Sequence, residues 1–348
     1  MRPADYLWAS MPIPELRIET TRGDLVESVH RVALAVVDAE GRLVASSGDT
    51  NLVTWWRSAA KPFQALPLLE DGAADAFQLS DEELALACAS HSSEPRHLSV
   101  VSAFMAKVGV TEEQLSCGVH TPLSPAVAQE VACGRAVPSP CWSNCSGKHT
   151  GMLALARHHG WPLPGYHAAG HPVQQRILEV LTRWTDLPTR EIRLSVDGCT
   201  AVCFGLPLRA MARSYARLGA STQPAPRRLL GAMSAHPFLV AGTGRLCTDL
   251  MLANPGEIIA KVGAEGIYSA ALPRLGLGLA LKVEDGDNRA AGMALLEALR
   301  QLGARMAPAL GELSAPDLAR HGSQPIRNTR GAITGELRAA GALRFSAS

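Results

Sequence analysis

Apolar and polar positions follow a strand-like spacing near the start of the chain and a helical spacing after it. Residues 26–37 and 41–47 are apolar runs around the turn residues 38–41, which predicts a β-hairpin. From about residue 58 to 236, apolar residues recur at helical spacing and are interrupted by Pro- and Gly-bearing loops. The expected helices are 58–69, 96–108, 125–133, 147–158, 172–184, 207–218 and 226–234. Ser80 and Glu83 have the spacing of a capping box before a further apolar run.

Strand-like runs return near residue 240. We expect strands at 257–264 and 276–283, linked through 266–275, then an amphipathic helix at 288–302 and one more strand near 329–337. The order is therefore strands, helical block, strands, helix. This order predicts an α/β protein of the α+β type, with an antiparallel sheet built from both chain ends, flanked by helices, and an inserted all-helical lobe. We expect a single catalytic domain over 1–348, with a sheet lobe at 1–57 plus 240–348 and a mainly helical lobe at 58–239.

Composition excludes several classes of protein. The net charge of +1, without a long run of one sign, argues against binding to nucleic acid. No apolar run approaches the roughly 18 residues of a membrane-spanning helix, and Met1 to Asp24 has no stretch typical of a signal peptide. We therefore expect a cytoplasmic protein without a membrane partner. Eight cysteines in so long a chain are not a disulfide framework.

Lysine is scarce in this chain. Only five of the 33 basic residues are lysines, at positions 61, 107, 148, 261 and 282, and the others are arginines. An arginine cannot supply a neutral amine, because the guanidinium group keeps its proton in proteins. Each remaining lysine is therefore a candidate for amine chemistry.

Ser58 and Lys61 are three residues apart at the expected start of a helix, so their side chains share one face. A serine hydroxyl needs a neighbouring base to become a good nucleophile. A lysine can be that base only when burial or a second cation lowers its pKa towards neutrality. Alternatively, Ser58 is a simple helix cap and Lys61 lies on a solvated face. The location after the hairpin favours catalysis, because it resembles the order in serine β-lactamases and penicillin-binding proteins.

Two other segments carry candidate groups for the same chemistry. Ser90 and His91 follow an apolar helix, where Ser90 could relay a proton to a leaving amine; ordinary loop polarity is the alternative. Lys261 and Gly263 resemble the Lys-x-Gly strand of the same superfamily, in which the cation faces the nucleophile; an exposed strand lysine is the alternative. Residues 242–247 could line a substrate pocket through backbone N–H groups or form a plain turn.

A fourth segment combines thiols with a lysine at a helix start. Cys145 and Lys148 lie on one helix face, His149 follows, and Asp197 and Cys199 lie in a later loop. Two thiolates suit zinc, although a lysine is an unusual ligand and must lose its proton. Buried cysteines beside a helix start are the alternative. A phosphate loop is rejected, because position 142 is Trp where that motif requires Gly.

Taken together, these segments resemble the asparaginase II family, the rhizobial-type or class 3 L-asparaginases, over about residues 10–340. The resemblance implies a fold similar to serine β-lactamases and class A glutaminases, and a homodimer. It implies Ser58 as the nucleophile, Lys61 as its base, and Ser90 with Lys261 as a second Ser–Lys dyad. The metal ligands that it implies for Zn²⁺ are Cys145, Lys148 and Cys199, with the ion supporting substrate binding. The residues implied near the substrate are Arg57, His91, His149 and Asp197.

One position departs from the family pattern. Thr200 stands where Gly is more usual in the family, and its side chain could narrow the pocket. The resemblance implies hydrolysis of L-asparagine to L-aspartate and ammonia through an acyl-enzyme. A glutaminase, another amidase or an esterase with the same Ser-x-x-Lys motif is the alternative within enzymes. A non-catalytic zinc-binding sensor domain on the same scaffold is the alternative from another class.

Overall fold

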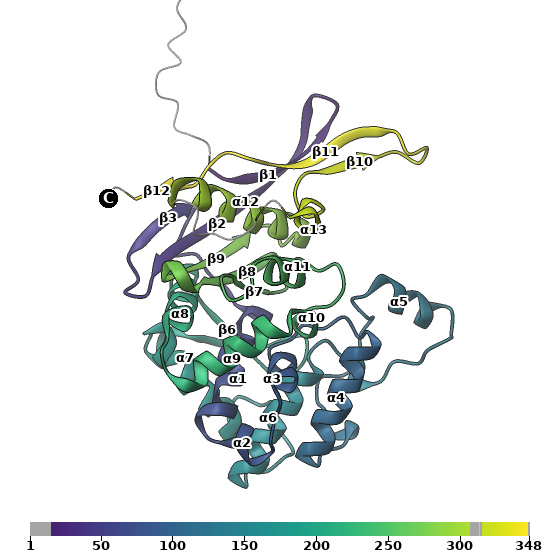
Figure 1. Ribbon diagram of the computed structural model, residues 1–348, viewed down its shortest axis with the longest axis vertical. Helices are drawn as coiled ribbons and strands as arrows, with labels where there is room; N and C mark the ends of the chain where they lie inside the picture. Colours follow the sequence, from purple (N-terminus) through teal and green to yellow (C-terminus); the bar gives the residue numbers. More distant parts are fainter. Residues whose placement is uncertain (1–14, 307–312, 314, 347–348) are drawn as a thin grey trace, which may run out of the picture.

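A nine-stranded antiparallel sheet, with strands from both chain ends side by side, dominates the fold (Figure 1). The computed structural model describes residues 15–306, 313 and 315–346. The sheet order is β10-β11-β1-β2-β9-β8-β7, with β3 beside β2 and β12 beside β3. The strands are β1 (Arg17–Arg22), β2 (Leu25–Asp38), β3 (Leu43–Ser47), β7 (Ile259–Val262), β8 (Ile267–Leu272), β9 (Leu277–Val283), β10 (Gln324–Arg327), β11 (Ile333–Ala340) and β12 (Arg344–Phe345). The expected mixed α/β class, with a sheet from both chain ends, is confirmed.

The centre of the sheet is covered on both faces. Residues 32–37 of β2 are all buried, although successive side chains of a strand point to opposite faces. The helices α8 (Leu208–Ala220) and α12 (Asn288–Met306) pack on these strands. A Cβ atom at Gly278 of β9 would lie 2.0 Å from the carbonyl oxygen of Ala212, so the α8 backbone rests directly on the sheet. Burial on both faces explains the nearly continuous apolar runs in the sequence.

Most expected helices are present with ends within a few residues of the prediction. Ser80 and Glu83 form the predicted capping box at the start of α3. The helices between the two groups of sheet strands are α1 (Lys61–Glu70), α2 (Ala73–Ala76), α3 (Asp81–Ala87), α4 (Pro95–Val108), α5 (Pro125–Ala132), α6 (Ser146–His159), α7 (Pro172–Thr185), α8, α9 (Pro224–Ala235) and α10 (Pro237–Val240), and α11 (Leu246–Ala253) precedes β7. Figure 1 places α1, α2, α3, α4 and α6 at the end of the molecule away from the large sheet.

The sequence prediction missed the strands β1, β10 and β12, and the structure also differs from it in the three places that follow. The inserted segment is not all helical, because it contains β5 (Arg193–Val196) and β6 (Val202–Pro207), which form a separate three-stranded sheet with β4 (Val53–Trp55) from the preceding segment. The predicted link 266–275 contains β8, a short buried run that pairs with both β7 and β9. The expected helix 58–69 is a 3-10 turn, Arg57–Ala60, followed by α1, whose N-cap is Ala60 and not Ser58.

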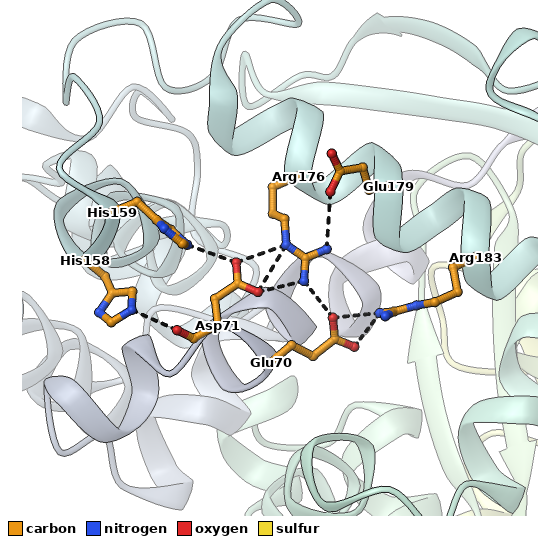
Figure 2. A network of polar contacts seen from close by, with 7 residues as sticks. All are labelled: Glu70, Asp71, His158, His159, Arg176, Glu179 and Arg183. Carbon is orange, nitrogen blue, oxygen red and sulfur yellow. Dashed lines mark hydrogen bonds and ion pairs between the residues drawn. The ribbon is translucent and has the colours of Figure 1, made fainter.

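An ion-pair network joins the end of α1 to α7 (Figure 2). The Arg176 guanidinium donates to Asp71 at 2.7 Å and to Glu70 at 2.9 Å, and all three side chains are at most 21% exposed. Arg183, about two helical turns further along α7, also binds Glu70. The network therefore fixes the packing of α1, the helix that begins at Lys61, three residues after Ser58.

Among residues 15–306, 313 and 315–346, no helix is long and apolar enough to cross a membrane. The lobe boundaries at 57/58 and 239/240 stay predictions, as does the cytoplasmic location. Residues 1–14 of the predicted sheet lobe, which include most of the stretch examined for a signal peptide, lie outside the described residues.

Candidate active site

Ser58 lies in the 3-10 turn between the small sheet and α1. The turn is held on both sides: the Trp56 backbone N–H donates to the Phe204 carbonyl at 2.8 Å, and the Tyr215 hydroxyl donates to the Ala59 carbonyl at 2.7 Å. Arg57 has a φ of +52°, a left-handed conformation that is uncommon for a residue other than Gly. The Ser58 side chain is partly exposed, and no described residue forms a hydrogen bond with its hydroxyl.

Two cavities meet at Ser58. The first, which we call the Asp197 cavity, has a volume of about 260 Å³ and is also lined by Arg57, Asp197 and three cysteines. The second, the Arg245 cavity, has a volume of about 360 Å³ and is also lined by Ser90 and Arg245. The residues that line both cavities are Ser58, Leu123, Asn144 and Ala264. The Ser58 hydroxyl is therefore accessible from two separate chambers.

Lys61 is buried directly behind this junction. Its amine donates to the carbonyl of Ala89, to the Ser90 hydroxyl at 3.2 Å and to the Asn144 carbonyl at 3.4 Å. Three acceptors around one amine match an ammonium group, which has three donors and no acceptor. No hydrogen bond joins Lys61 to Ser58, so the direct contact expected from their spacing is not present in this structure.

Lys261, on β7, also contacts the Ser90 hydroxyl. Its amine donates to Ser90 Oγ at 2.9 Å and to the Val262 carbonyl at 2.8 Å. Burial, and then the nearby Lys61 amine, lower the pKa of Lys261 to about 7. The sequence prediction made Lys61 the amine held neutral by a second cation. In the structure it is Lys261 whose pKa falls to about 7, because of its burial and the neighbouring Lys61 amine.

Arg57 and Asp197 form an ion pair in the wall of the Asp197 cavity. The Arg57 Nε donates to Asp197 Oδ1 at 2.8 Å, and the Gly198 N–H donates to the same oxygen at 2.7 Å. Burial acts to raise the pKa of Asp197, but the Lys148 and Arg57 cations hold it below its usual value. The carboxylate is therefore charged near neutral pH and stands beside Ser58 with a cation next to it.

His91 lies beneath the site and does not line either cavity. Its ring is fully buried; Nδ1 accepts from the Ser93 N–H at 3.2 Å, and Nε2 lies 2.8 Å from the Ser146 hydroxyl. Burial, followed by His97 and Lys61, lowers the pKa of His91. The neutral ring then donates from Nε2 to Ser146. The structure therefore places His91 under the loop that carries Ser90, where it supports the site without reaching the substrate cavities.

Cys145, Lys148 and Cys199 come together at the Asp197 cavity. The Lys148 amine donates to Cys199 Sγ at 2.9 Å, and both thiols line the cavity. A hydrogen bond with Cys199 lowers the pKa of Cys145 well below its usual range, although burial opposes this shift. The Cys145 and Cys199 thiols raise the pKa of Lys148 against the effect of burial. A Cβ atom at Gly147 would lie 2.3 Å from the Leu86 carbonyl oxygen, so this end of α6 rests on α3.

The donor set of this cluster fits a zinc ion. Within the part of the chain that the structure describes, no three His, Cys, Asp or Glu side chains are grouped to hold a metal, so the third donor has to be Lys148. Two thiols and one amine leave a fourth position open to the cavity. His149, which is buried, directs Nδ1 at the Tyr166 hydroxyl at 2.6 Å, and its ring also interacts with the Cys199 thiol, which acts to raise the pKa of His149 against the effect of burial. Like His91, His149 does not line either cavity.

Some cavity residues were not predicted as site residues. Asn144 links Lys61 to the loop that carries Ser90 and His91, because its carbonyl accepts hydrogen bonds from the Lys61 amine and from the His91 N–H. Arg245 donates to the Ser90 carbonyl at 3.3 Å and to the Ser92 hydroxyl at 3.2 Å. It belongs to the segment 242–247, in which the sequence indicated only backbone groups. Ala264 follows Gly263 and carries no chemical signal in the sequence.

A family model described as L-asparaginase II matches residues 18–339. No curated protein matches the chain. Among solved structures, a beta-lactamase from Mycobacterium bovis is 13% identical with a TM-score of 0.36, over 80% of this chain and 96% of that chain. A mutant of simvastatin synthase (LovD) from Aspergillus terreus is 14% identical with a TM-score of 0.33, over 72% and 84%. Mglu in its native form is 17% identical with a TM-score of 0.36, over 82% and 62%.

Proposed function

The chain belongs to the L-asparaginase II family and is an amidohydrolase, and from this premise we propose that it hydrolyses L-asparagine to L-aspartate and ammonia through an acyl-enzyme on Ser58. The observation that carries the proposal is the position of the Ser58 hydroxyl beside the Arg57–Asp197 ion pair. A cation and a carboxylate next to each other match the α-carboxylate and α-ammonium groups of a free amino acid. The side-chain amide of asparagine would then reach the hydroxyl.

Lys61, Ser90 and Lys261 supply a path for the proton of Ser58. The neutral amine of Lys261 takes the Ser90 proton, and Ser90 takes one from Lys61, along contacts of 2.9 and 3.2 Å. Lys61 is then a neutral amine one helical turn from Ser58 and accepts the hydroxyl proton as Ser58 attacks the amide carbon. Catalytic hydrogen bonds are often long without substrate and tighten in the complex. In this scheme Lys61 is the base, and Lys261 makes it neutral.

Backbone N–H groups would stabilise the oxyanion that forms on the amide oxygen. Ser58 and Ala264 both line the two cavities, and no described residue accepts a hydrogen bond from the N–H of either. One such donor typically contributes about 3–4 kcal/mol to the transition state. Ammonia then leaves after it takes a proton through Ser90, and water hydrolyses the ester by the reverse transfer.

Zn²⁺ at Cys145, Lys148 and Cys199 is part of the proposal. The bound ion would supply positive charge at the wall of the Asp197 cavity and so favour an anionic group of the substrate. Lys148 would bind it as a neutral amine, so loading would release protons. His149, whose ring interacts with the Cys199 thiol, would help to position that ligand. His91, which was predicted to lie near the substrate, would act indirectly by supporting the loop that carries Ser90. A homodimer is proposed on the family resemblance alone, and sedimentation of the purified chain tests it.

The test is release of ammonia from L-asparagine and from L-glutamine by the wild-type chain and by Ser58→Ala, with p-nitrophenyl esters as further substrates. We expect release from asparagine and complete loss in the variant. Mass spectrometry should show an aspartyl adduct on Ser58 in wild type. Faster turnover of glutamine or of esters would support the alternative enzymes. A zinc-binding sensor domain would give no adduct with any amide, and retained activity in Ser58→Ala would refute the nucleophile.

A further inference from the structure

The Arg245 cavity lies on the side of Ser58 to which a leaving amine departs. Ser90, the hydroxyl that would return a proton to the leaving nitrogen, lines this cavity and does not line the Asp197 cavity. The recognition pair Arg57–Asp197 lines only the other chamber. An acyl group bound beside Asp197 therefore directs its leaving group towards Arg245.

This chamber is much larger than ammonia requires. Its volume of about 360 Å³ exceeds that of the Asp197 cavity, at about 260 Å³, which would have to hold the whole amino-acid part of the substrate. Ammonia contains a single non-hydrogen atom. The cavity therefore has room for an amine that carries a substituent of several atoms.

The lining of this chamber contains basic side chains. Arg245, Arg289 and His321 line it, and no Asp or Glu is among the described residues of its wall. Arg289 is paired with Asp287 at 2.9 Å, and His321 with Asp249 at 2.5 Å.

Arg245 differs from these two groups. Its guanidinium donates hydrogen bonds to the Ser90 carbonyl and the Ser92 hydroxyl, and within the described part of the chain no carboxylate pairs with it. A partly buried guanidinium without an acidic partner favours a carboxylate from a ligand. Its contact with the Ser90 carbonyl places that ligand group next to the hydroxyl that handles the leaving amine.

We propose that the Arg245 cavity is a leaving-group subsite for amines that bear a carboxylate, so that the enzyme also cleaves β-aspartyl bonds to amino acids. This inference rests on the proposed function. Ser58 Oγ attacks the β-carbonyl carbon, the C–N bond breaks, and the departing amino acid takes a proton through Ser90. Water then cleaves the aspartyl ester, so the products are L-aspartate and the free amino acid. Arg245 binds the carboxylate of the leaving amino acid throughout.

The test compares β-aspartyl-glycine with β-aspartyl-glycinamide, which lacks only the terminal carboxylate, with L-asparagine as the reference substrate. We expect wild type to cleave the acid with a kcat/KM about tenfold or more above that of the amide, as a charge-assisted hydrogen bond would give. Arg245→Gln should bring this ratio close to one, and Arg245→Lys should restore part of it. The control is Arg135→Gln, because the Arg135 guanidinium pairs with Glu130 at 2.7 Å and lines neither cavity; it should change the ratio less than twofold.

The acid-to-amide ratio separates binding of the carboxylate from a purely structural role of Arg245. Loss of the Ser90 contact alone would lower both rates equally and leave the ratio unchanged, which would overturn the proposal. Equal cleavage of the acid and the amide by the wild-type protein would also overturn the proposal. This comparison needs no variant, so it does not depend on whether a variant folds. Ammonia release from asparagine without cleavage of β-aspartyl-glycine would refute the subsite and leave the asparaginase proposal intact. Inactivity towards all three substrates would refute both.

Discussion

The amine of Lys261 donates a hydrogen bond of 2.9 Å to the hydroxyl of Ser90, and both side chains are buried. Lys61 donates to the same hydroxyl at 3.2 Å. Two ammonium groups cannot share one buried hydroxyl without a large electrostatic cost. One of the two amines is therefore neutral near neutral pH. A neutral amine can accept the proton that a serine nucleophile has to give up.

Activity should rise with pH through about 7, the value to which burial and Lys61 lower the pKa of Lys261. Below this pH Lys261 is protonated and cannot take the Ser90 proton. Cys247 and Cys145 act to raise this pKa, and Arg245 acts to lower it. Together with burial and Lys61, these residues set the pH at which activity is half of its maximum. The measurement is kcat/KM for asparagine from pH 5.5 to 8.5. A flat profile would contradict the role of Lys261.

Replacing Lys261 by Met should abolish activity and raise the melting temperature at pH 7. The folded pKa of about 7 lies below the ordinary value of 10.5, so between these pH values the unfolded chain binds more protons. Wild-type stability should therefore rise with pH across this window, and the neutral Met side chain should remove that slope. Thermal unfolding at pH 7 and pH 10 measures both effects. An inactive variant that melts lower than wild type would show that the amine stabilises the fold.

Lys61→Arg should lower kcat by about 10²-fold or more, the usual contribution of a positioned general base, although the charge is kept. A guanidinium cannot pass through a neutral state, and its planar shape does not match three acceptors around a single amine. The control is Lys107→Arg, because Lys107 pairs with Glu83 at 2.7 Å outside both cavities. Steady-state assays of the two variants make the comparison. Equal activities would remove Lys61 as the base.

Asp197→Asn should raise KM for asparagine by about tenfold or more, because the α-ammonium group loses its charged partner. The kcat should change less, since Asp197 does not touch the reacting amide in the proposed complex. Asp186→Asn makes the same change in an ion pair with Arg213, at 2.6 Å, and should leave KM unchanged. An unchanged KM in Asp197→Asn would place the amino-acid group elsewhere.

Thr200→Val should destabilise the protein by about 1–2 kcal/mol more than Thr200→Gly. Thr200 has a φ of +72°, which is unfavourable for a β-branched residue, and its hydroxyl donates to the Ser116 carbonyl at 2.6 Å. Val keeps the strain and loses the hydrogen bond, whereas Gly loses both. Urea unfolding of the three proteins tests this balance. A Val variant as stable as the Gly variant would mean that the backbone is not strained.

Arg176→Met should lower the free energy of unfolding by about 2–3 kcal/mol, because Glu70 and Asp71 would lose their shared cation in a partly buried position (Figure 2). The neighbouring pair offers a control: Glu179 is 70% exposed and 3.7 Å from Arg176, so Glu179→Gln should cost less than about 0.5 kcal/mol. Denaturant titration measures both variants. Similar losses in the two would show that the network acts through surface charge alone.

The sequence was sufficient for the hairpin and most helices, because the spacing of apolar residues is a local signal. The grouping of Ser58, Ser90 and Lys261 into one active site was implied by the family resemblance and stays a prediction. The sequence was insufficient for β8, whose short apolar run could equally be a buried loop. It could not show that the pKa of Lys261 falls to about 7, since this depends on burial and on the distance to Lys61 after folding. Arg245 was missed as a site residue for a related reason, because an arginine without an acidic partner is recognisable only when all its neighbours are known.

Gly147 has a consequence for how the thiol cluster could be altered. Its missing side chain lets the first turn of α6 lie against the Leu86 carbonyl, with Cys145 and Lys148 on either side of the contact point. Even a single added methyl group would push the helix away and carry a sulfur and an amine with it in the same movement. The position of the two thiols and the amine is thus tied to a packing contact between two helices, and a mutation as small as Gly to Ala would shift the cluster without changing any of its side chains.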